Sequence, residues 1–139
     1  MKKSRNIGKI LLVAVAIALL CALLTSCGLF NSLNTITSAN VVARIGLEKT
    51  ADGAYEVQAG KEFTLAVVWN NKRALYPSIE WHEVLDGKDS TLPLFKNEQI
   101  LTYTHKREDI GKTFSYYAKV NEFVRAEGIK VRVTKAKLD

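Results

Sequence analysis

Cysteine and proline are both scarce in this chain, with two of each among 139 residues. Both cysteines, Cys21 and Cys27, lie in the N-terminal part, so residues 28–139 contain none. A segment without cysteine can form neither a disulfide nor a zinc site built on thiolates. Any domain within residues 28–139 must therefore be held together by its hydrophobic core.

Acidic residues are absent before Glu48, whereas four of the first nine residues, Lys2, Lys3, Arg5 and Lys9, are basic. The formal net charge of the whole chain is +6, from 20 basic and 14 acidic side chains. Without these four, 16 basic and 14 acidic side chains remain, a balance of +2. A charge this small does not predict a nucleic-acid partner.

A long uncharged run follows the basic segment, because residues 10–24 contain no charged residue, glycine or proline. A positive segment followed by an apolar run is typical of a secretory signal peptide. The alternative is a permanent transmembrane anchor. As a helix this run would be about 22 Å long, shorter than the roughly 30 Å hydrocarbon core. A tilted helix or a thinned bilayer would still permit a span. We expect residues 1–26 to be a signal peptide.

The apolar run ends in Leu24-Thr25-Ser26-Cys27, which resembles the lipobox of bacterial lipoproteins. The resemblance implies cleavage before Cys27 and diacylation of its thiol, typically with palmitate, and two or more acyl chains are what stable anchoring requires. It also implies a domain outside the cytoplasm, held at the cell membrane of a Gram-positive bacterium. In a Gram-negative envelope, Gly28 in place of Asp would direct it to the outer membrane or periplasm. The alternative is an unmodified cysteine at the end of a membrane helix.

The rest of the chain divides into a tether and a domain. Residues 27–40 are expected to be the lipidated cysteine and a flexible tether, because residues 28–40 are rich in Ser, Thr and Asn. Residues 41–137 break into short β-branched and aromatic runs between turn signals, which predicts an all-β, antiparallel sandwich of about seven strands. The expected strands are Val41–Leu47, Ala54–Val57, Glu62–Trp69, Ser78–Leu85, Leu92–Phe95, Gln99–Tyr103, Thr113–Val120 and Ile129–Val133.

Two segments of this domain resemble the immunoglobulin-like fold. Pro77-Ser78-Ile79-Glu80-Trp81 is similar to its third strand, whose tryptophan packs between the sheets, and residues 108–116 are similar to the Asp-x-Gly-x-Tyr corner before its sixth strand. The resemblance implies a buried Trp81 and a hairpin over Asn121–Gly128. The chain departs from the family because it lacks both disulfide cysteines and has its corner aromatic later, at Phe114.

Catalytic and metal-binding patterns are weak in this sequence. Glu80 and His82 share one face of an expected strand and could begin a metal site, but no third ligand is identifiable. His105 is expected to be a solvated loop residue. No Gly-x-Ser-x-Gly elbow or phosphate-binding loop occurs. We therefore expect no catalytic residues, no metal, no cofactor and no enzymatic activity.

Loops are the remaining candidates for function, because loops on a rigid sandwich commonly carry binding residues. The connections Asn70–Tyr76, Lys96–Glu98 and Asn121–Gly128 are expected to meet at one end. They would display Arg73, Tyr76, Phe123 and Arg125, which are residue types enriched at interface hot spots. The alternative is that Tyr76 and Phe123 fold back over the core.

These observations predict a membrane-tethered, non-enzymatic binding or accessory module of the bacterial cell envelope. It would recognise a protein or an envelope glycan through its loops. The alternative is a structural spacer or assembly subunit of an envelope complex.

Overall fold

The computed structural model describes residues 8–20 and 35–138. Residues 8–20 are helical, and within the described ranges no helix is both long and apolar enough to cross a membrane. A separate compact unit begins at Ile36. Leu24–Cys27 and most of the expected tether lie outside the described residues, so cleavage and lipidation remain predictions.

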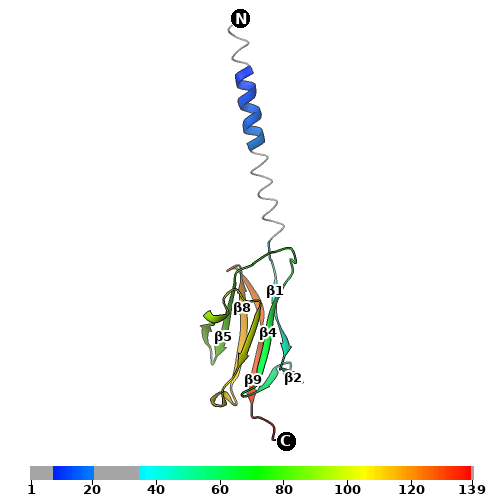
Figure 1. Ribbon diagram of the computed structural model, residues 1–139, viewed down its shortest axis with the longest axis vertical. Helices are drawn as coiled ribbons and strands as arrows, with labels where there is room; N and C mark the ends of the chain where they lie inside the picture. Colours follow the sequence, from blue (N-terminus) through cyan, green and yellow to red (C-terminus); the bar gives the residue numbers. More distant parts are fainter. Residues whose placement is uncertain (1–7, 21–34, 139) are drawn as a thin grey trace. The chain divides into compact units, whose positions relative to one another are not determined.

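The unit that begins at Ile36 is built from strands, as the sequence predicts, with two short 3₁₀ helices between them (Figure 1). The strands are β1 (Ala39–Ile45), β2 (Glu48–Lys49), β3 (Tyr55–Gln58), β4 (Glu62–Trp69), β5 (Ile79–Leu85), β6 (Lys88–Thr91), β7 (Ile100–Thr104), β8 (Thr113–Val120) and β9 (Val124–Thr134). The 3₁₀ helices are η1 (Pro93–Phe95) and η2 (Arg107–Asp109).

The strands form a single curled sheet in the order β6-β5-β8-β9-β1-β4-β7. Neighbours in this path are antiparallel except β9 and β1, which are joined by the parallel pair of Glu127 with Asn40. The short β3 pairs in parallel with β9 and antiparallel with β2. Because the sheet curls, side chains from both of its arms point into one core.

The core confirms the alternation predicted for the two most regular strands. In β4, Phe63, Leu65 and Val67 are fully buried, and in β8 the core-facing side chains Phe114, Tyr116, Ala118 and Val120 are buried. Ala66 of β4 and Tyr117 of β8, on the opposite faces of these strands, are buried too. Trp81 of β5 is also fully buried, as expected, and its Nε1–H donates a 2.8 Å hydrogen bond to the carbonyl of Glu98.

The strand expected at Leu92–Phe95 is wrong, because these residues form the turn of η1. Pro93 lacks an N–H for a strand ladder and starts this helix instead. The strand in this region is β6, whose four residues are all exposed. Such a strand has no alternation of apolar and polar residues by which it could be predicted.

The hairpin expected over Asn121–Gly128 is present, because β8 and β9 pair antiparallel, but its turn is shorter than expected, since β9 already begins at Val124. Only residues 121–123 form the turn, with positive φ at Asn121 and Glu122. Gly128 lies inside β9, at a bulge opposite Tyr117. A Cβ at this position would lie 2.6 Å from the Tyr116 carbonyl oxygen, so glycine is required for the close approach.

The N-terminal start of the domain lies beside the β4–β5 connection. Ile36 and Ala39 are buried, so the folded part begins before the expected boundary at Val41. The Asn70 side chain accepts hydrogen bonds from the N–H groups of Thr37 and Ser38, and it donates to the Thr37 hydroxyl at 2.6 Å. The chain therefore enters β1 at the same end of the domain as this connection.

Candidate functional site

Three connections meet around the first residues of β5, as the sequence predicts. The Asn121 side chain accepts a hydrogen bond from the N–H of Ser78, and the Asn97 side chain accepts one from the N–H of Ile79. The reverse bonds run from Asn121 N–H to the Ser78 carbonyl and from Asn97 N–H to the Ile79 carbonyl. We call residues 70–78, 96–98 and 121–123 the loop end.

Large apolar side chains of the loop end project into solvent instead of folding over the core. Tyr76 is 97% exposed, Phe123 is 92% exposed and Leu75 is 77% exposed. The alternative that Tyr76 and Phe123 pack back on the core is therefore wrong. Tyr76 has φ of 52°, a left-handed conformation that is strained for a bulky residue. Such strain is concentrated at functional sites, which makes Tyr76 a candidate contact residue.

The basic residues predicted with these aromatics occupy different places. Lys72 and Arg73 are exposed in the β4–β5 connection, and Arg73 N–H donates to the Asn71 side chain at 3.0 Å. Arg125 is not in a loop, because it lies in β9 with its guanidinium carbon 3.8 Å from the centre of the Tyr117 ring. The structure therefore groups Arg73 with Tyr76 and Phe123 at the loop end and places Arg125 on the outer sheet surface.

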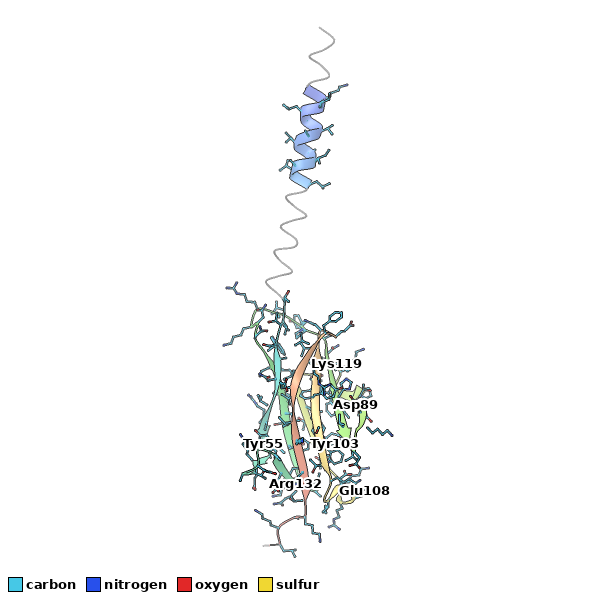
Figure 2. All side chains as sticks on the ribbon, turned by 180° about the vertical axis from the view of Figure 1, so that it is seen from behind. Tyr55, Asp89, Tyr103, Glu108, Lys119 and Arg132 are labelled. Carbon is cyan, nitrogen blue, oxygen red and sulfur yellow. The ribbon has the colours of Figure 1, made fainter. Side chains whose placement is uncertain are left out.

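The outer surface of β5 and β8 holds a closed polar cluster around His82. The His82 ring stacks on Tyr117 at 4.5 Å between centres. Its Nε2 lies 2.7 Å from Glu80 and its Nδ1 lies 2.8 Å from Asp89. Asp89 also accepts a short hydrogen bond from the Tyr117 hydroxyl, and this bond is the main reason why the pKa of Asp89 is lowered. Figure 2 shows Asp89 and Lys119 along this surface.

This cluster does not form a metal site. Glu80 and Asp89 bind opposite nitrogens of one imidazole ring, so their oxygens do not converge on a single ion. Across residues 8–20 and 35–138, no group of three His, Cys, Asp or Glu side chains is arranged to hold a metal. Asp89 was not predicted as a partner of His82, because it lies in β6, a strand that was not predicted from the sequence.

His105 is buried, so the expectation of a solvated loop residue is wrong. It is 1% exposed, and its ring stacks on Phe114 at 4.2 Å and on Phe63 at 5.6 Å. Its Nε2 lies 2.9 Å from the Tyr116 hydroxyl, and its Nδ1 lies 3.3 Å from Asp109. The Tyr116 hydroxyl in turn donates to Glu83 at 2.6 Å.

The charge states in this buried network follow from desolvation. Burial lowers the pKa of His105, even though the neighbouring carboxylates of Asp109 and Glu83 oppose this shift. Burial also raises the pKa of Tyr116, and the hydrogen bond to Glu83 adds to the increase. His105 is therefore neutral and Tyr116 is protonated at neutral pH. Both histidines of the domain use their nitrogens in internal contacts.

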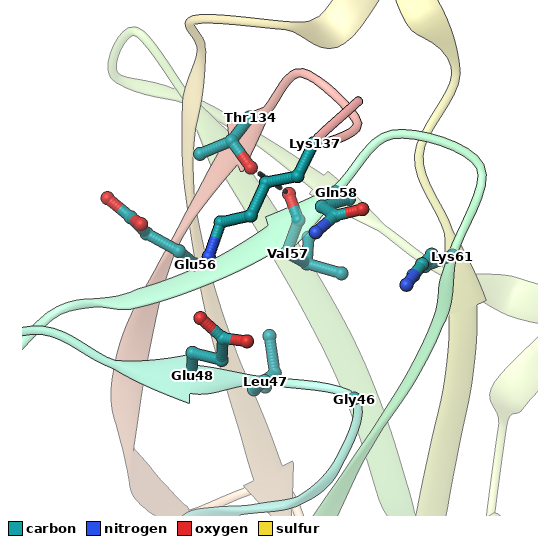
Figure 3. Close-up of a pocket in the computed structure, with 9 residues that line it drawn as sticks. All are labelled: Gly46, Leu47, Glu48, Glu56, Val57, Gln58, Lys61, Thr134 and Lys137. Atoms are coloured by element: carbon teal, nitrogen blue, oxygen red, sulfur yellow. Dashed lines mark hydrogen bonds between the residues drawn. The ribbon is translucent and has the colours of Figure 1, made fainter. Parts of the chain in front are cut away.

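A pocket of about 330 Å³ lies at the opposite end of the domain from the loop end (Figure 3). Its lining includes two carboxylates, Glu48 and Glu56, and two lysines, Lys61 and Lys137. In Figure 3 the Lys137 side chain extends across β3 toward Glu56. Because the lining charges balance, the pocket favours no single class of charged ligand. It is a weaker candidate than the loop end.

Sequence reasoning identified Arg73, Tyr76 and Phe123 but missed Leu75 and the asparagines that order the loop end. Asn97 and Asn121 both have positive φ, a conformation in which asparagine is enriched. Asparagines between two expected strands were the available signal for such turns. No known protein family and no curated protein matches this chain, so its function must be inferred from this geometry.

Proposed function

We propose that this chain is a lipid-anchored protein of the bacterial cell envelope and that its β domain is a non-enzymatic binding or accessory module. The anchor would be diacylated Cys27, following the lipobox-like segment Leu24–Cys27. The domain would lie outside the cytoplasm. The proposed binding surface is the loop end.

The exposure of Tyr76 and Phe123 on ordered loops is the observation that carries this proposal. Side chains of this size are usually at least partly covered in a monomeric domain, and exposed apolar groups that cluster mark interaction sites. The side chains of Asn97 and Asn121 accept hydrogen bonds from the N–H groups at the start of β5, and these bonds hold the surrounding backbone in place. The surface is therefore organised before any partner arrives, which reduces the entropy cost of binding.

The absence of enzymatic activity is proposed from the state of the candidate catalytic groups. A general base must reach a substrate, but His105 is buried and His82 lies between two carboxylates and a tyrosine ring. Neither histidine has a nitrogen left to activate a serine or a water molecule.

We also propose that the domain is an immunoglobulin-like sandwich without the disulfide. Support comes from the strand pairing. β1 pairs with β4 and β3 pairs with β9, so the N-terminal strands take part in both halves of the curled sheet, as they do in the two sheets of a sandwich. The buried Trp81 of β5 fits the same fold. A crystal structure with two separate packed sheets would support this proposal, and a closed barrel would contradict it.

Binding of soluble residues 28–139 to isolated bacterial envelopes tests the proposed surface. We expect the triple variant R73A/Y76A/F123A to bind at least about ten-fold more weakly, because one hot-spot truncation costs about 1–2 kcal/mol. The matched control is I45A/L138A, which removes two exposed apolar side chains outside the loop end. Circular dichroism checks that each variant is folded.

Each outcome of this experiment has a distinct meaning. Weaker binding of the triple variant alone supports the loop end as the binding surface. Equal binding by all three proteins would move the site to another surface. No binding by any of them would contradict the binding module and favour the alternative, a structural spacer.

A further inference from the structure

The position of the loop end relative to the start of β1 restricts what can bind there. Thr37 and Ser38 are hydrogen-bonded to Asn70, the first residue of the connection that carries Arg73, Leu75 and Tyr76. The chain from Cys27 therefore joins the domain beside this surface. β9 runs parallel to β1 and ends at the opposite end of the domain (Figure 1).

The number of residues before Thr37 limits how far the loop end can be from a lipid on Cys27. The ten residues 28–37 lead from Cys27 to Thr37, and a fully extended chain covers at most about 3.6 Å per residue, or about 36 Å. Thr37, and with it the Asn70 side chain to which it is hydrogen-bonded, therefore cannot lie further than this from the anchor. A connection this short gives the lipid surface an effective concentration in the millimolar range, as the loop end experiences it.

The side chains of the loop end have the chemistry of a membrane-surface contact. Tyrosine is enriched at the boundary between headgroups and acyl chains, and phenylalanine and leucine bury their side chains slightly deeper. Tyr76, Phe123 and Leu75 supply these three types at high exposure. Ordinary burial in the domain does not account for them.

The charges of the loop end complement an anionic lipid surface. No acidic residue lies between Glu62 and Glu80, whereas Lys72 and Arg73 lie in this stretch and are exposed. The loop end itself contains three basic side chains (Lys72, Arg73, Lys96) and two acidic ones (Glu98, Glu122), a balance of +1. Two further basic residues, Lys119 of β8 and Arg125 of β9, lie on the adjoining strands. Basic residues close to a membrane are attracted by its anionic lipids.

We infer that the loop end binds the anionic lipid surface of the same membrane that holds Cys27, which gives the domain a second attachment and a fixed orientation. This inference rests on the proposed lipid anchor and names the partner of the proposed surface. A protein or glycan partner of the loop end would have to fit between the domain and the membrane, within the reach of the ten residues. The opposite end, with the pocket shown in Figure 3, would face away from the membrane.

Fluorescence quenching by labelled lipids tests this inference on the full chain. The protein is purified from bacterial membranes and reconstituted in protein-free vesicles of phosphatidylglycerol and phosphatidylcholine. Single cysteines at Tyr76, Phe123 or Ile45 carry an environment-sensitive dye, and the vesicles contain lipids with a quencher near the headgroup. Ile45 is the matched control, because it is 73% exposed at the far end of β1. The chain without an added cysteine is the labelling blank.

We expect quenching at positions 76 and 123 to be at least about three-fold stronger than at position 45, because only the loop end enters the headgroup region. The double variant K72Q/R73Q should lower quenching at position 123 to its value in pure phosphatidylcholine vesicles. The control variant K135Q/K137Q removes two exposed charges elsewhere and should leave it unchanged.

The outcomes separate this inference from the function on which it rests. Protein that floats with vesicles but shows equal quenching at the three positions would overturn the inference while the anchor stands. If the loop end also binds isolated envelopes in that case, its partner is a protein or a glycan. Protein that does not float with vesicles, or a blank that takes up the dye at Cys27, would overturn the lipid anchor and the inference together.

Discussion

The buried His105 should make the stability of the domain depend on pH in a specific way. In the unfolded chain this histidine binds a proton near pH 6.5, whereas burial lowers its pKa in the folded domain. Below pH 6.5 the unfolded state therefore binds more protons than the folded state, and acid favours unfolding. The stability contributed by neutral His105 is complete above pH 6.5 and is lost as the pH falls toward the lowered folded-state pKa.

The size of this stability loss follows from the linkage between proton binding and unfolding. While His105 stays neutral in the folded state, each pH unit below 6.5 lowers the free energy of unfolding by about 1.4 kcal/mol. Between pH 6.5 and pH 5 the loss can therefore reach about 2 kcal/mol, a large part of the stability of a small domain. In this range Asp109 stays ionised, because hydrogen bonds from Lys112, His105 and the Lys106 N–H outweigh its burial and lower its pKa.

The variant His105→Phe removes this titration with little change in packing, because the ring lies between Phe63 and Phe114. Urea unfolding of residues 28–139, followed by tryptophan fluorescence between pH 5 and pH 8, measures the free energy of unfolding of both proteins. The two proteins differ only at residue 105, so the difference between them reports on this site. We expect the wild type to lose stability relative to the variant below pH 6.5. If the free energies of unfolding of the two proteins change with pH in parallel, the reasoning is refuted.

Three further substitutions test the packing. Trp81→Ala should lower the free energy of unfolding by about 3–5 kcal/mol in the same urea assay, because it empties a core site and removes the bond to Glu98. Gly128→Ala should lower the free energy of unfolding by about 1–3 kcal/mol, because the added Cβ would meet the Tyr116 carbonyl oxygen. Its control is Lys130→Ala, at an exposed position of the same strand, which should change the free energy of unfolding by less than about 0.5 kcal/mol. Tyr117→Phe should raise the pKa of Asp89 in an NMR titration, because the lost hydrogen bond is the main cause of its lowering.

The sequence predicted those strands that combine burial with a regular alternation. Residues 62–69 and 113–120 are strands with the expected bounds, because one of their faces is apolar throughout and fills the core. The same reasoning failed for β6, whose side chains are all exposed. It also failed for the start of β9, because the bulge at Gly128 shifts the alternation from Val124 and Ala126 to Ile129 and Val131. Alternation reports burial, so it cannot detect a strand that lies at a solvated edge.

The candidate site was predictable in its residue types but not in its construction. Exposed aromatic and basic residues between expected strands pointed to Arg73, Tyr76 and Phe123. Their common location depends on Asn97 and Asn121, whose side chains bind backbone groups 18 and 43 residues earlier in the chain. Contacts between residues so far apart leave no periodic signal. The burial of His105 was missed for a similar reason, because its partners come from three separate elements, β4, β8 and η2.

The lipid on Cys27 is the central claim, and mass spectrometry of the N-terminal peptide tests it most directly. The protein is expressed from the full sequence in a bacterium, extracted from the membrane fraction and digested. The account predicts a mature chain that begins at Cys27 and carries a diacylglyceryl group on its thiol, whereas Cys27→Ser should abolish both cleavage and modification. A membrane-bound protein with an unmodified Cys27 and an intact N terminus would contradict it.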